Sequence, residues 1–462
     1  MNESPAPPTA SKPSSSAAPS RLRRRLCPAL LACAGASLLY ESSSARAPNP
    51  DASTPITVQA PSARLLADSL GIVTHLDYLN TPYGDFEKVK ASLAFLGIHN
   101  LRDTMPRTNT VRYEALAGLH YHFDLVVRSE AANELPTTLA RLESLEQHFP
   151  GAIASIEGLN EANHWPAVYR GLRGFPATIA LQQDLYAAVK QSTTLRRVPV
   201  YAPTLGGAGT LDYQRLGDLS DYADLANAHI YFPKGSPPSQ VWDAAVALNR
   251  LSTPRLPQTA ITETGYTTAR RSEHRVDEPT QAKYLLMLLA HAWSAGITHL
   301  YIYQLVDDST DDADWTRGLG LYAFDWRAKP AATAMHHLLE ALRAKQRPEA
   351  GHEAPSLSYT TSPVSADVRT LLLHTDGGGF DLLIWRDVPL WDNVNYLPRA
   401  YAPLHVSLTE NFATLEAVML EPLSGGRRVL RAKNARIEFD LTDEPLLLEL
   451  SERSSSPSDP LR

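Results

Sequence analysis

The stretch Ala154-Ser155-Ile156-Glu157-Gly158-Leu159-Asn160-Glu161 decides the fold, because an apolar run in it ends abruptly in a carboxylate. A second stretch of this kind, Thr259-Ala260-Ile261-Thr262-Glu263, is followed at once by Thr264-Gly265-Tyr266. Charged side chains are rarely buried unless they are paired. The two endings therefore predict two strands of one sheet whose ends bring Glu161 and Glu263 into the same cleft.

Around these two stretches, short apolar runs alternate with amphipathic helical segments across residues 67–345, which is typical of α/β folds with a parallel sheet. Eight strands are expected, at residues 71–75, 98–102, 122–127, 153–159, 198–202, 225–230, 259–262 and 297–305. The helices are expected at residues 85–96, 112–119, 139–148, 181–194, 213–219, 242–251, 279–295 and 330–343. Eight strand–helix units predict a (β/α)8 TIM barrel, in which active groups lie on the loops after the strands. Glu161 and Glu263 follow the fourth and the seventh expected strand.

The helical period disappears after residue 346, where prolines and a glycine mark a boundary. Alternating or apolar runs between turns then predict an all-β sandwich over residues 346–451. Its strands are expected at residues 370–374, 380–385, 405–408, 414–420, 436–441 and 446–450. Residues 452–462 form a Ser/Pro-rich tail, and residues 48–66 are expected to be a linker with room for one strand at 54–59.

The first 47 residues are expected to be an export segment with a disordered beginning. Four arginines between residues 21 and 25 precede the apolar residues 26–40, which are too few to span a bilayer. One ending is a lipobox, Leu30-Leu31-Ala32-Cys33, which would make Cys33 a lipid anchor to a membrane; the other is cleavage after Ala45 or Ala47. A start codon assigned too early remains the alternative. The export interpretation predicts a periplasmic, secreted or outer-membrane protein.

Charge and cysteine content exclude several classes of function. The formal net charge of the chain is −7, and residues 1–47 carry six of the basic but only two of the acidic residues. An acidic body argues against nucleic acid as a partner. Both cysteines, Cys27 and Cys33, lie in the export segment, so the body has no disulfide, no cysteine nucleophile and no thiolate metal site. No nucleophile-elbow or phosphate-binding motif occurs, and residues 206–209 are interpreted as a flexible glycine-rich loop.

Several motifs together resemble those of clan A retaining glycoside hydrolases. They are GLNEANHW (158–165), AITETGY (260–266), NAHIYFP (227–233), LGIHNLRD (96–103), YIYQLVDD (301–308) and KPAATAMHHLLEAL (329–342). A barrel followed by a sandwich is most similar to glycoside hydrolase family 39 and its bacterial relatives. The resemblance spans about residues 68–345. It implies a carbohydrate substrate with β-type linkages and a reaction that needs no cofactor and no metal.

The resemblance implies a role for each matching residue. Glu161 corresponds to the general acid/base and Glu263 to the nucleophile, a pair that needs carboxyl groups about 5–5.5 Å apart with one of them protonated. Asn160 would donate to a sugar hydroxyl, and Arg102 would keep Glu263 anionic. Tyr231 would reach the nucleophile, and His229 would line the same floor.

Four further side chains are candidates for holding the sugar or closing the cleft. Trp165 is the expected stacking platform, and His75 would contact a distal sugar. Tyr303 closes the eighth strand, where members of the resembled group often place a tryptophan. Trp315 lies in an acidic loop, residues 307–317, that is expected to form a lid or a rim.

Structural interpretations of two further features and two rival functions also remain open. Glu157 is expected to be a buried structural carboxylate rather than a third catalyst. The sandwich is expected to be a structural accessory; the alternative is that Trp385 and Trp391 bind carbohydrate. The rival functions are a carbohydrate-binding or polysaccharide-assembly protein with weak catalysis and a transglycosylase that uses the same site.

Overall fold

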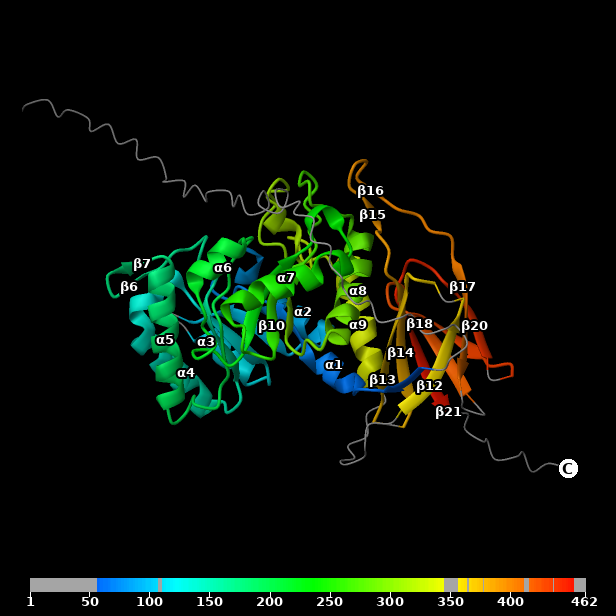
Figure 1. Ribbon diagram of the computed structural model, residues 1–462, viewed down its shortest axis with the longest axis horizontal. Coiled ribbons are helices and arrows are strands. Elements are labelled where there is room, and N and C mark those ends of the chain that lie inside the picture. Colours follow the sequence, from blue (N-terminus) through cyan, green and yellow to red (C-terminus); the bar gives the residue numbers. More distant parts are fainter. Residues whose placement is uncertain are drawn as a thin grey trace, which may run out of the picture.

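A parallel barrel and an antiparallel sandwich lie side by side in the protein (Figure 1). The computed structural model describes residues 56–106, 110–344, 356–363, 365–376, 378–410, 415–434 and 436–452. The expected export segment with Cys33, and the tail beyond residue 452, lie outside the described residues. Within the described ranges, no helix has both the length and the apolar character that crossing a membrane requires.

The expected TIM-type barrel is confirmed. Eight parallel strands are hydrogen-bonded in the order β8-β5-β4-β3-β2-β11-β10-β9, and a bridge from Tyr201 to Leu225 joins β8 to the segment before β9. The strands are β2 (Leu70–Val73), β3 (Asn100–Thr104), β4 (His122–Val127), β5 (Ile153–Leu159), β8 (Val200–Tyr201), β9 (Ala226–Tyr231), β10 (Thr259–Gly265) and β11 (Leu300–Ile302).

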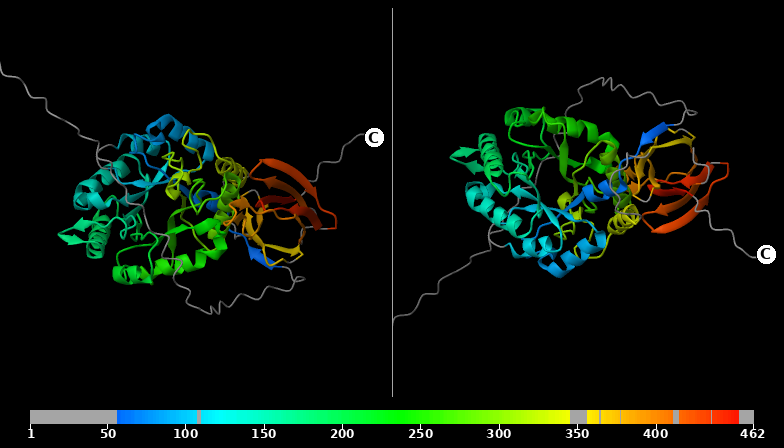
Figure 2. Two further views of the ribbon diagram at one scale, coloured as in Figure 1. Left: turned by 90° about the horizontal axis from the view of Figure 1, so that it is seen from above. Right: turned by 90° about the horizontal axis from the view of Figure 1, so that it is seen from below.

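Helices surround the strands on the outside of the barrel, as the views from above and below show (Figure 2). Asp85 accepts a hydrogen bond from the Lys88 backbone N–H at the start of α2, and Gly97 ends that helix with a φ of +67°. Left-handed backbone of this kind favours glycine. The helices are α1 (Ala63–Ser69), α2 (Phe86–Leu96), α3 (Val111–Ala117), α4 (Leu135–His148), α5 (Phe175–Gln191), α6 (Thr210–Leu216), α7 (Trp242–Asn249), α8 (Glu278–Ser294) and α9 (Pro330–Arg343).

The sandwich consists of two antiparallel sheets, in the orders β1-β12-β17-β20 and β13-β14-β21-β18-β19. Its longer strands are β12 (Ser356–Ser362), β13 (Val368–His374), β14 (Phe380–Arg386), β17 (Leu404–Glu410), β18 (Leu415–Glu421), β19 (Gly426–Arg431), β20 (Arg436–Leu441) and β21 (Leu446–Glu452). β1 (Ile56–Gln59) pairs with β12, and α1 begins at Ala63. The stretch 48–66 is therefore not only a linker, because it contains an edge strand of the sandwich and the first turn of α1.

The sandwich packs on the barrel through a shared apolar core. Trp385, Trp391, Leu383 and Leu447 are buried in the same cluster of side chains as the barrel helices α8 and α9, which lie between the two units in Figure 1. The Tyr284 hydroxyl on α8 accepts a hydrogen bond of 2.7 Å from the backbone N–H of Leu390. The alternative that Trp385 and Trp391 bind carbohydrate is wrong, since at 3% and 5% exposure both belong to this core.

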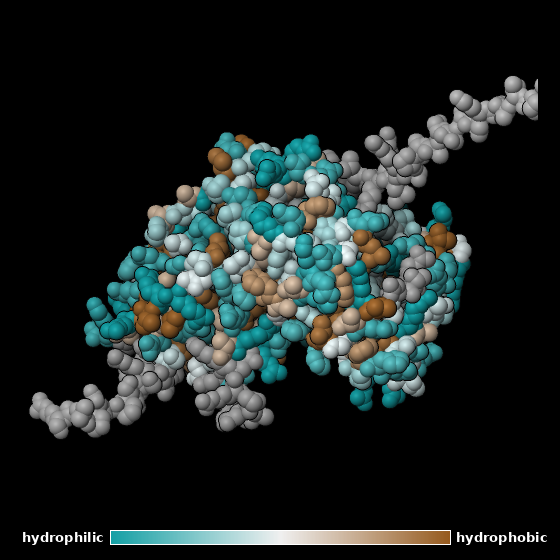
Figure 3. All heavy atoms as spheres, turned by 180° about the vertical axis from the view of Figure 1, so that it is seen from behind, coloured by the Kyte–Doolittle hydropathy of each residue, from teal (hydrophilic) through white to brown (hydrophobic). Residues whose placement is uncertain are grey.

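Hydrophobic side chains on the face shown in Figure 3 are scattered among hydrophilic ones. Such a mixture is usual for the surface of a folded domain. Polar side chains are also buried inside the barrel. Those on its strands include Arg102, Asp124, Glu157, Asn227 and Thr262.

Candidate active site

The carboxyl ends of the barrel strands bring six of the predicted residues together. Arg102 is on β3, Glu263 on β10, and His229 and Tyr231 on β9, where Glu263 is the direct neighbour of His229 in the sheet. Asn160 and Glu161 follow β5. Because all strands are parallel, these ends meet at one mouth of the barrel.

Glu161 and Glu263 face each other across a short gap. One carboxylate oxygen of each and one ring nitrogen of His229 all lie within 4.8 Å of one another. The Glu161 side chain is 19% exposed and the Glu263 side chain 10% exposed, so both border the cleft from a largely buried position.

Glu263 is held by two donors. Nη1 of Arg102 donates to its Oε1 at 2.5 Å, and the Tyr231 hydroxyl donates to its Oε2 at 2.7 Å. Each carboxylate oxygen thus has one partner, which fixes the rotamer of Glu263.

A buried ion pair supports Arg102 from below. Glu157, whose side chain is 1% exposed, accepts from Arg102 Nε at 2.7 Å and from Nη2 at 3.1 Å. Burial alone would raise the pKa of Glu157, but the charge of Arg102 together with hydrogen bonds from Asp124 and Arg102 outweighs burial and lowers this pKa to about 2. Glu157 is therefore a structural carboxylate that orients Arg102 rather than a group that meets a ligand.

Asn160 lies within the same network. Arg102 Nη2 donates to its side-chain oxygen at 2.8 Å. This contact fixes the amide orientation, because an arginine can only donate. The amide nitrogen of Asn160 is then the group left to donate to a ligand.

His229 stands between the two glutamates. Its Nδ1 lies 3.1 Å from Glu161 Oε1 and 3.5 Å from Glu263 Oε2, and its Nε2 lies 3.5 Å from Arg102 Nη2. Since the guanidinium can only donate, Nε2 is the acceptor and Nδ1 carries the proton. Burial raises the pKa of Glu161, but the hydrogen bond from His229 together with the charges of His229, His164 and Arg102 outweighs burial and lowers this pKa below its ordinary value. The expected raised pKa of one catalytic carboxyl is therefore not found at Glu161.

Aromatic side chains line one side of the cleft. The Tyr303 hydroxyl lies 3.3 Å from His75 Nε2, and the Tyr303 ring meets the Tyr231 ring edge-on at 6.4 Å. The Tyr231 ring in turn meets the Trp315 ring edge-on at 4.9 Å. His75, Tyr303, Tyr231 and Trp315 thus form a continuous arc from the end of β2 to the loop after β11.

Trp165 lies apart from this arc. It is 50% exposed, and its backbone N–H donates to the carbonyl of Glu161 at 3.0 Å within the turn after β5. It remains a predicted stacking platform at the rim.

The acidic loop after β11 is neutralised by arginines and a lysine. Asp308 accepts two hydrogen bonds from Arg317, and Asp307 pairs with the buried Lys329 at 2.8 Å. Arg271 pairs with Asp312. These pairs tie the loop at several points, and Trp315 lies against Tyr231.

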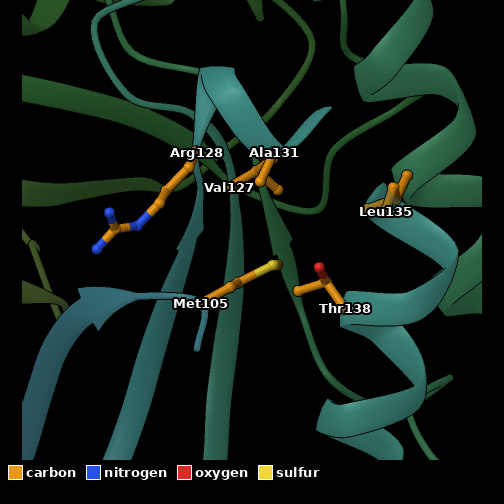
Figure 4. Close-up of a pocket in the computed structure, with 6 residues that line it drawn as sticks. All are labelled: Met105, Val127, Arg128, Ala131, Leu135 and Thr138. Carbon is orange, nitrogen blue, oxygen red and sulfur yellow. The ribbon is translucent and has the colours of Figure 1, made fainter. Parts of the chain in front are cut away.

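Two small cavities lie among the described residues. The first, of about 10 Å³, lies between β4 and α4; Figure 4 shows Met105 and Thr138 facing each other there while Arg128 points away. The second is equally small, and its lining includes Tyr231 and Trp315. The spacing of Glu161, His229 and Glu263 would also suit a metal ion. We assign none, because Arg102 already supplies the positive charge next to Glu263 and His229.

Sequence reasoning missed the groups that hold Glu161. Glu161 has a φ of +40°, and its backbone N–H donates to Thr204 Oγ1 at 3.0 Å. Gly206 packs on the Glu161 carboxyl, and Asn163 binds Gly206 through two hydrogen bonds. The interpretation of residues 206–209 as a flexible loop did not include these contacts of Gly206. The only signal was the run of glycines, whose partner no spacing rule reveals.

Solved glycoside hydrolase structures share this fold. A family 39 glycoside hydrolase from the gut symbiont Bacteroides cellulosilyticus WH2 matches with a TM-score of 0.57 at 13% identity, over 85% of this chain and 81% of that one. A monomeric β-xylosidase from Caulobacter crescentus CB15 matches with a TM-score of 0.54 at 14% identity, over 86% of this chain and 98% of that one. The family 39 enzyme from Xanthomonas axonopodis pv. citri matches with a TM-score of 0.52 at 14% identity, over 85% and 95%.

No family model matches the sequence, and no curated protein matches it. At these identities the likeness establishes the fold and the order of barrel and sandwich. The predicted similarity to family 39 structures is confirmed at that level.

Proposed function

We propose that the protein is a retaining glycoside hydrolase that cleaves β-linked glycosides with Glu263 as nucleophile and Glu161 as general acid/base. The separation of the two carboxylates carries this proposal. Retaining enzymes hold the pair about 5–5.5 Å apart, whereas inverting enzymes need about 6.5–9.5 Å to admit a water molecule. The nearest oxygens of Glu161 and Glu263 lie within 4.8 Å of each other, which is compatible with the shorter separation.

In the first step, a carboxylate oxygen of Glu263 attacks the anomeric carbon. The bond from that carbon to the leaving oxygen breaks, its electron pair stays on the oxygen, and the proton of Glu161 moves there. Arg102 and Tyr231 hold Glu263 correctly turned until it attacks. The product of this step is a glycosyl ester of Glu263.

In the second step, Glu161 accepts a proton from water while the water oxygen attacks the anomeric carbon. The ester bond to Glu263 breaks and returns its carboxylate. Each step inverts the configuration at the anomeric carbon, so the two steps together retain it. His229 Nδ1 is near both carboxylates, so it can donate to whichever of them is ionised as the proton moves.

The binding groups support a neutral sugar at the centre of the cleft. Asn160 offers an amide donor beside the reaction centre, and the arc of His75, Tyr303, Tyr231 and Trp315 offers aromatic edges and faces to apolar sugar C–H groups. One similar structure is a β-xylosidase, so aryl β-xylosides belong first in the panel of substrates.

Azide rescue of two alanine variants tests the proposal. With an activated aryl β-glycoside, Glu263→Ala should form an α-glycosyl azide, because azide replaces the lost nucleophile in one inversion. Glu161→Ala should form the β-glycosyl azide, because azide intercepts the ester. A wild-type protein that turns over no glycoside in the panel, or azides with the opposite configurations, would contradict the assignment.

A further inference from the structure

Three contacts show that a segment outside the catalytic pair fixes Glu161. The backbone N–H of Glu161 donates to Thr204 Oγ1 at 3.0 Å, and the N–H of Ala162 donates to the Thr204 carbonyl at 2.9 Å. The Thr204 N–H returns a bond of 3.0 Å to the carbonyl of Leu159. The chain after β5 is therefore hydrogen-bonded on both sides of Glu161 to the loop after β8, which holds its left-handed φ of +40°.

Gly206, two residues further, touches the Glu161 carboxyl itself. A Cβ placed on Gly206 would lie 2.5 Å from Cδ of Glu161, 2.6 Å from its Oε1 and 2.5 Å from Cδ2 of His164. The φ of Gly206 is outside the left-handed range, so space rather than backbone conformation requires a glycine here. Oε1 is also the oxygen that meets His229 at 3.1 Å. With Oε1 held between His229 and Gly206, Oε2 is the oxygen left for a ligand.

Asn163 locks Gly206 in this place. Its Nδ2 donates to the Gly206 carbonyl at 2.7 Å, and its Oδ1 accepts from the Gly206 N–H at 2.9 Å. A two-bond contact of this kind fixes both the position and the orientation of the glycine peptide. Asn163 follows Glu161 by two residues, so the segment that carries the carboxylate also holds the wall behind it.

We propose that Asn163 and Gly206 form a clamp that positions the acid/base carboxyl of Glu161. The inference deepens the proposed function and rests on it. Neither residue touches the substrate: Gly206 blocks one rotamer direction of Glu161, and Asn163 keeps Gly206 there. The clamp should have its largest effect on glycosides with a weakly acidic leaving alcohol, because their cleavage depends most on proton donation.

The test compares leaving groups in Asn163→Ala and Gly206→Ala. Both variants should keep kcat/KM for a dinitrophenyl β-glycoside within about 3-fold of wild type, since that leaving group needs no proton. For an alkyl β-glycoside, kcat/KM should fall about 10-fold or more, a share of the 10²–10⁴ that general acid catalysis contributes. Gly206→Ala should fold, because its new methyl group meets only the ends of two side chains.

Asn100→Ala is the matched control. Asn100 also binds the backbone through its amide, at 2.7 Å to Asp68 and 3.3 Å to Leu70, but it lies at the other end of β3. This control should lower the urea midpoint without changing the dependence on leaving group. Glu161→Ala supplies the reference for a lost proton donor.

The possible outcomes distinguish a failure of the clamp from a failure of the proposed function. The clamp is overturned, and the proposed function stands, if kcat/KM depends strongly on the acidity of the leaving group in Glu161→Ala but not in Asn163→Ala and Gly206→Ala. Equal losses for both glycosides in the two clamp variants would also overturn it, since that pattern indicates a structural defect only. A flat dependence in Glu161→Ala would overturn the acid/base role itself, and the clamp with it.

Discussion

At the scale of single residues, His229 sets the protonation of the site. Its Nδ1 lies 3.1 Å from Glu161 Oε1 and 3.5 Å from Glu263 Oε2, and its hydrogen bond is the largest of the effects that lower the pKa of Glu161 against burial. A general acid must be protonated in the free enzyme for kcat/KM to be high. The activity is therefore expected to decline as pH rises through the lowered pKa of Glu161, which gives an acidic optimum.

Replacing His229 by alanine should move the alkaline limb of the pH profile. Without the donor to its Oε1, the pKa of Glu161 should rise, and the decline of kcat/KM should move to higher pH even as the maximum rate falls. The measurement is kcat/KM of an aryl β-glycoside between pH 4 and pH 9. His405→Ala, which removes an exposed histidine of the sandwich, should leave the limb in place. An alkaline limb that stays or moves to lower pH in His229→Ala would contradict this role.

The sequence predicted the catalytic pair because each glutamate ends an apolar run, and strand ends of a parallel barrel must meet. The positions of Arg102, His229 and Tyr231 around Glu263 were expected only from the resemblance to retaining glycoside hydrolases. Asn163, Thr204 and Gly206 could not be predicted, because their contacts depend on the path of the loop after β8. The lowered pKa of Glu161 was equally hidden, since it depends on the rotamer of His229.

At the scale of elements, the loop after β11 is a rigid rim held by one buried ion pair. Lys329 Nζ pairs with Asp307 at 2.8 Å and also donates to Thr268 and to the Gly318 carbonyl. Burial raises the pKa of Asp307 to about 6, although Lys329 opposes this rise. The pair anchors both ends of the segment that carries Trp315.

Lys329→Met should destabilise the protein by about 3–5 kcal/mol, the usual cost of leaving one buried charge without its partner. The loss should be larger at pH 8 than at pH 5, because the stranded Asp307 can take up a proton at the lower pH and its folded-state pKa lies above the unfolded value. Urea denaturation at the two pH values measures it.

The matched control is Arg327→Met, which breaks the more exposed pair with Glu278 and should cost less than about 1 kcal/mol. An equal cost for the two variants, or a Lys329→Met loss that shrinks at pH 8, would contradict the anchoring role.

Helices and strands were predictable where a single hydrophobic period dominates the sequence. The strands at residues 122–127 and 153–159 have the predicted bounds, as does the helix at 330–343. β12 and β19 were missed. The sequence of β19, Gly-Arg-Arg-Val-Leu-Arg, reads as a charged surface segment, and it is an edge strand, where charged side chains are usual. β1 lies within the strand expected at 54–59. The other strands of its sheet lie some 300 residues further along the chain, so no local pattern assigns β1 to the sandwich.

At the scale of the whole molecule, barrel and sandwich share a core and should unfold together. Leu383 and Leu382 are neighbours on β14, but Leu383 points into the core shared with the barrel and Leu382 into the interior of the sandwich. Alternation along a strand sends successive side chains to opposite faces. The pair therefore separates the contact between the two units from the stability of the sandwich alone.

Leu383→Ala and Leu382→Ala should each lower the stability of the whole protein by about 2–5 kcal/mol, with a single transition in both. Urea unfolding is followed by far-UV circular dichroism, which reports both units, and by loss of activity, which reports the barrel. Coincident transitions are expected. A Leu382→Ala variant that stays active after its sandwich has unfolded would show that the barrel is independent and contradict the shared core.

The central claim is that Glu263 becomes covalently bonded to the sugar, and the most direct measurement is the mass of a trapped enzyme. A 2-deoxy-2-fluoro aryl β-glycoside with an activated leaving group slows the second step more than the first and should leave one fluoroglycosyl unit on the protein. We predict that peptide mapping places this unit on Glu263 and that Glu263→Ala acquires none. Inactivation without a mass increase, or a label on any residue other than Glu263, would contradict the account.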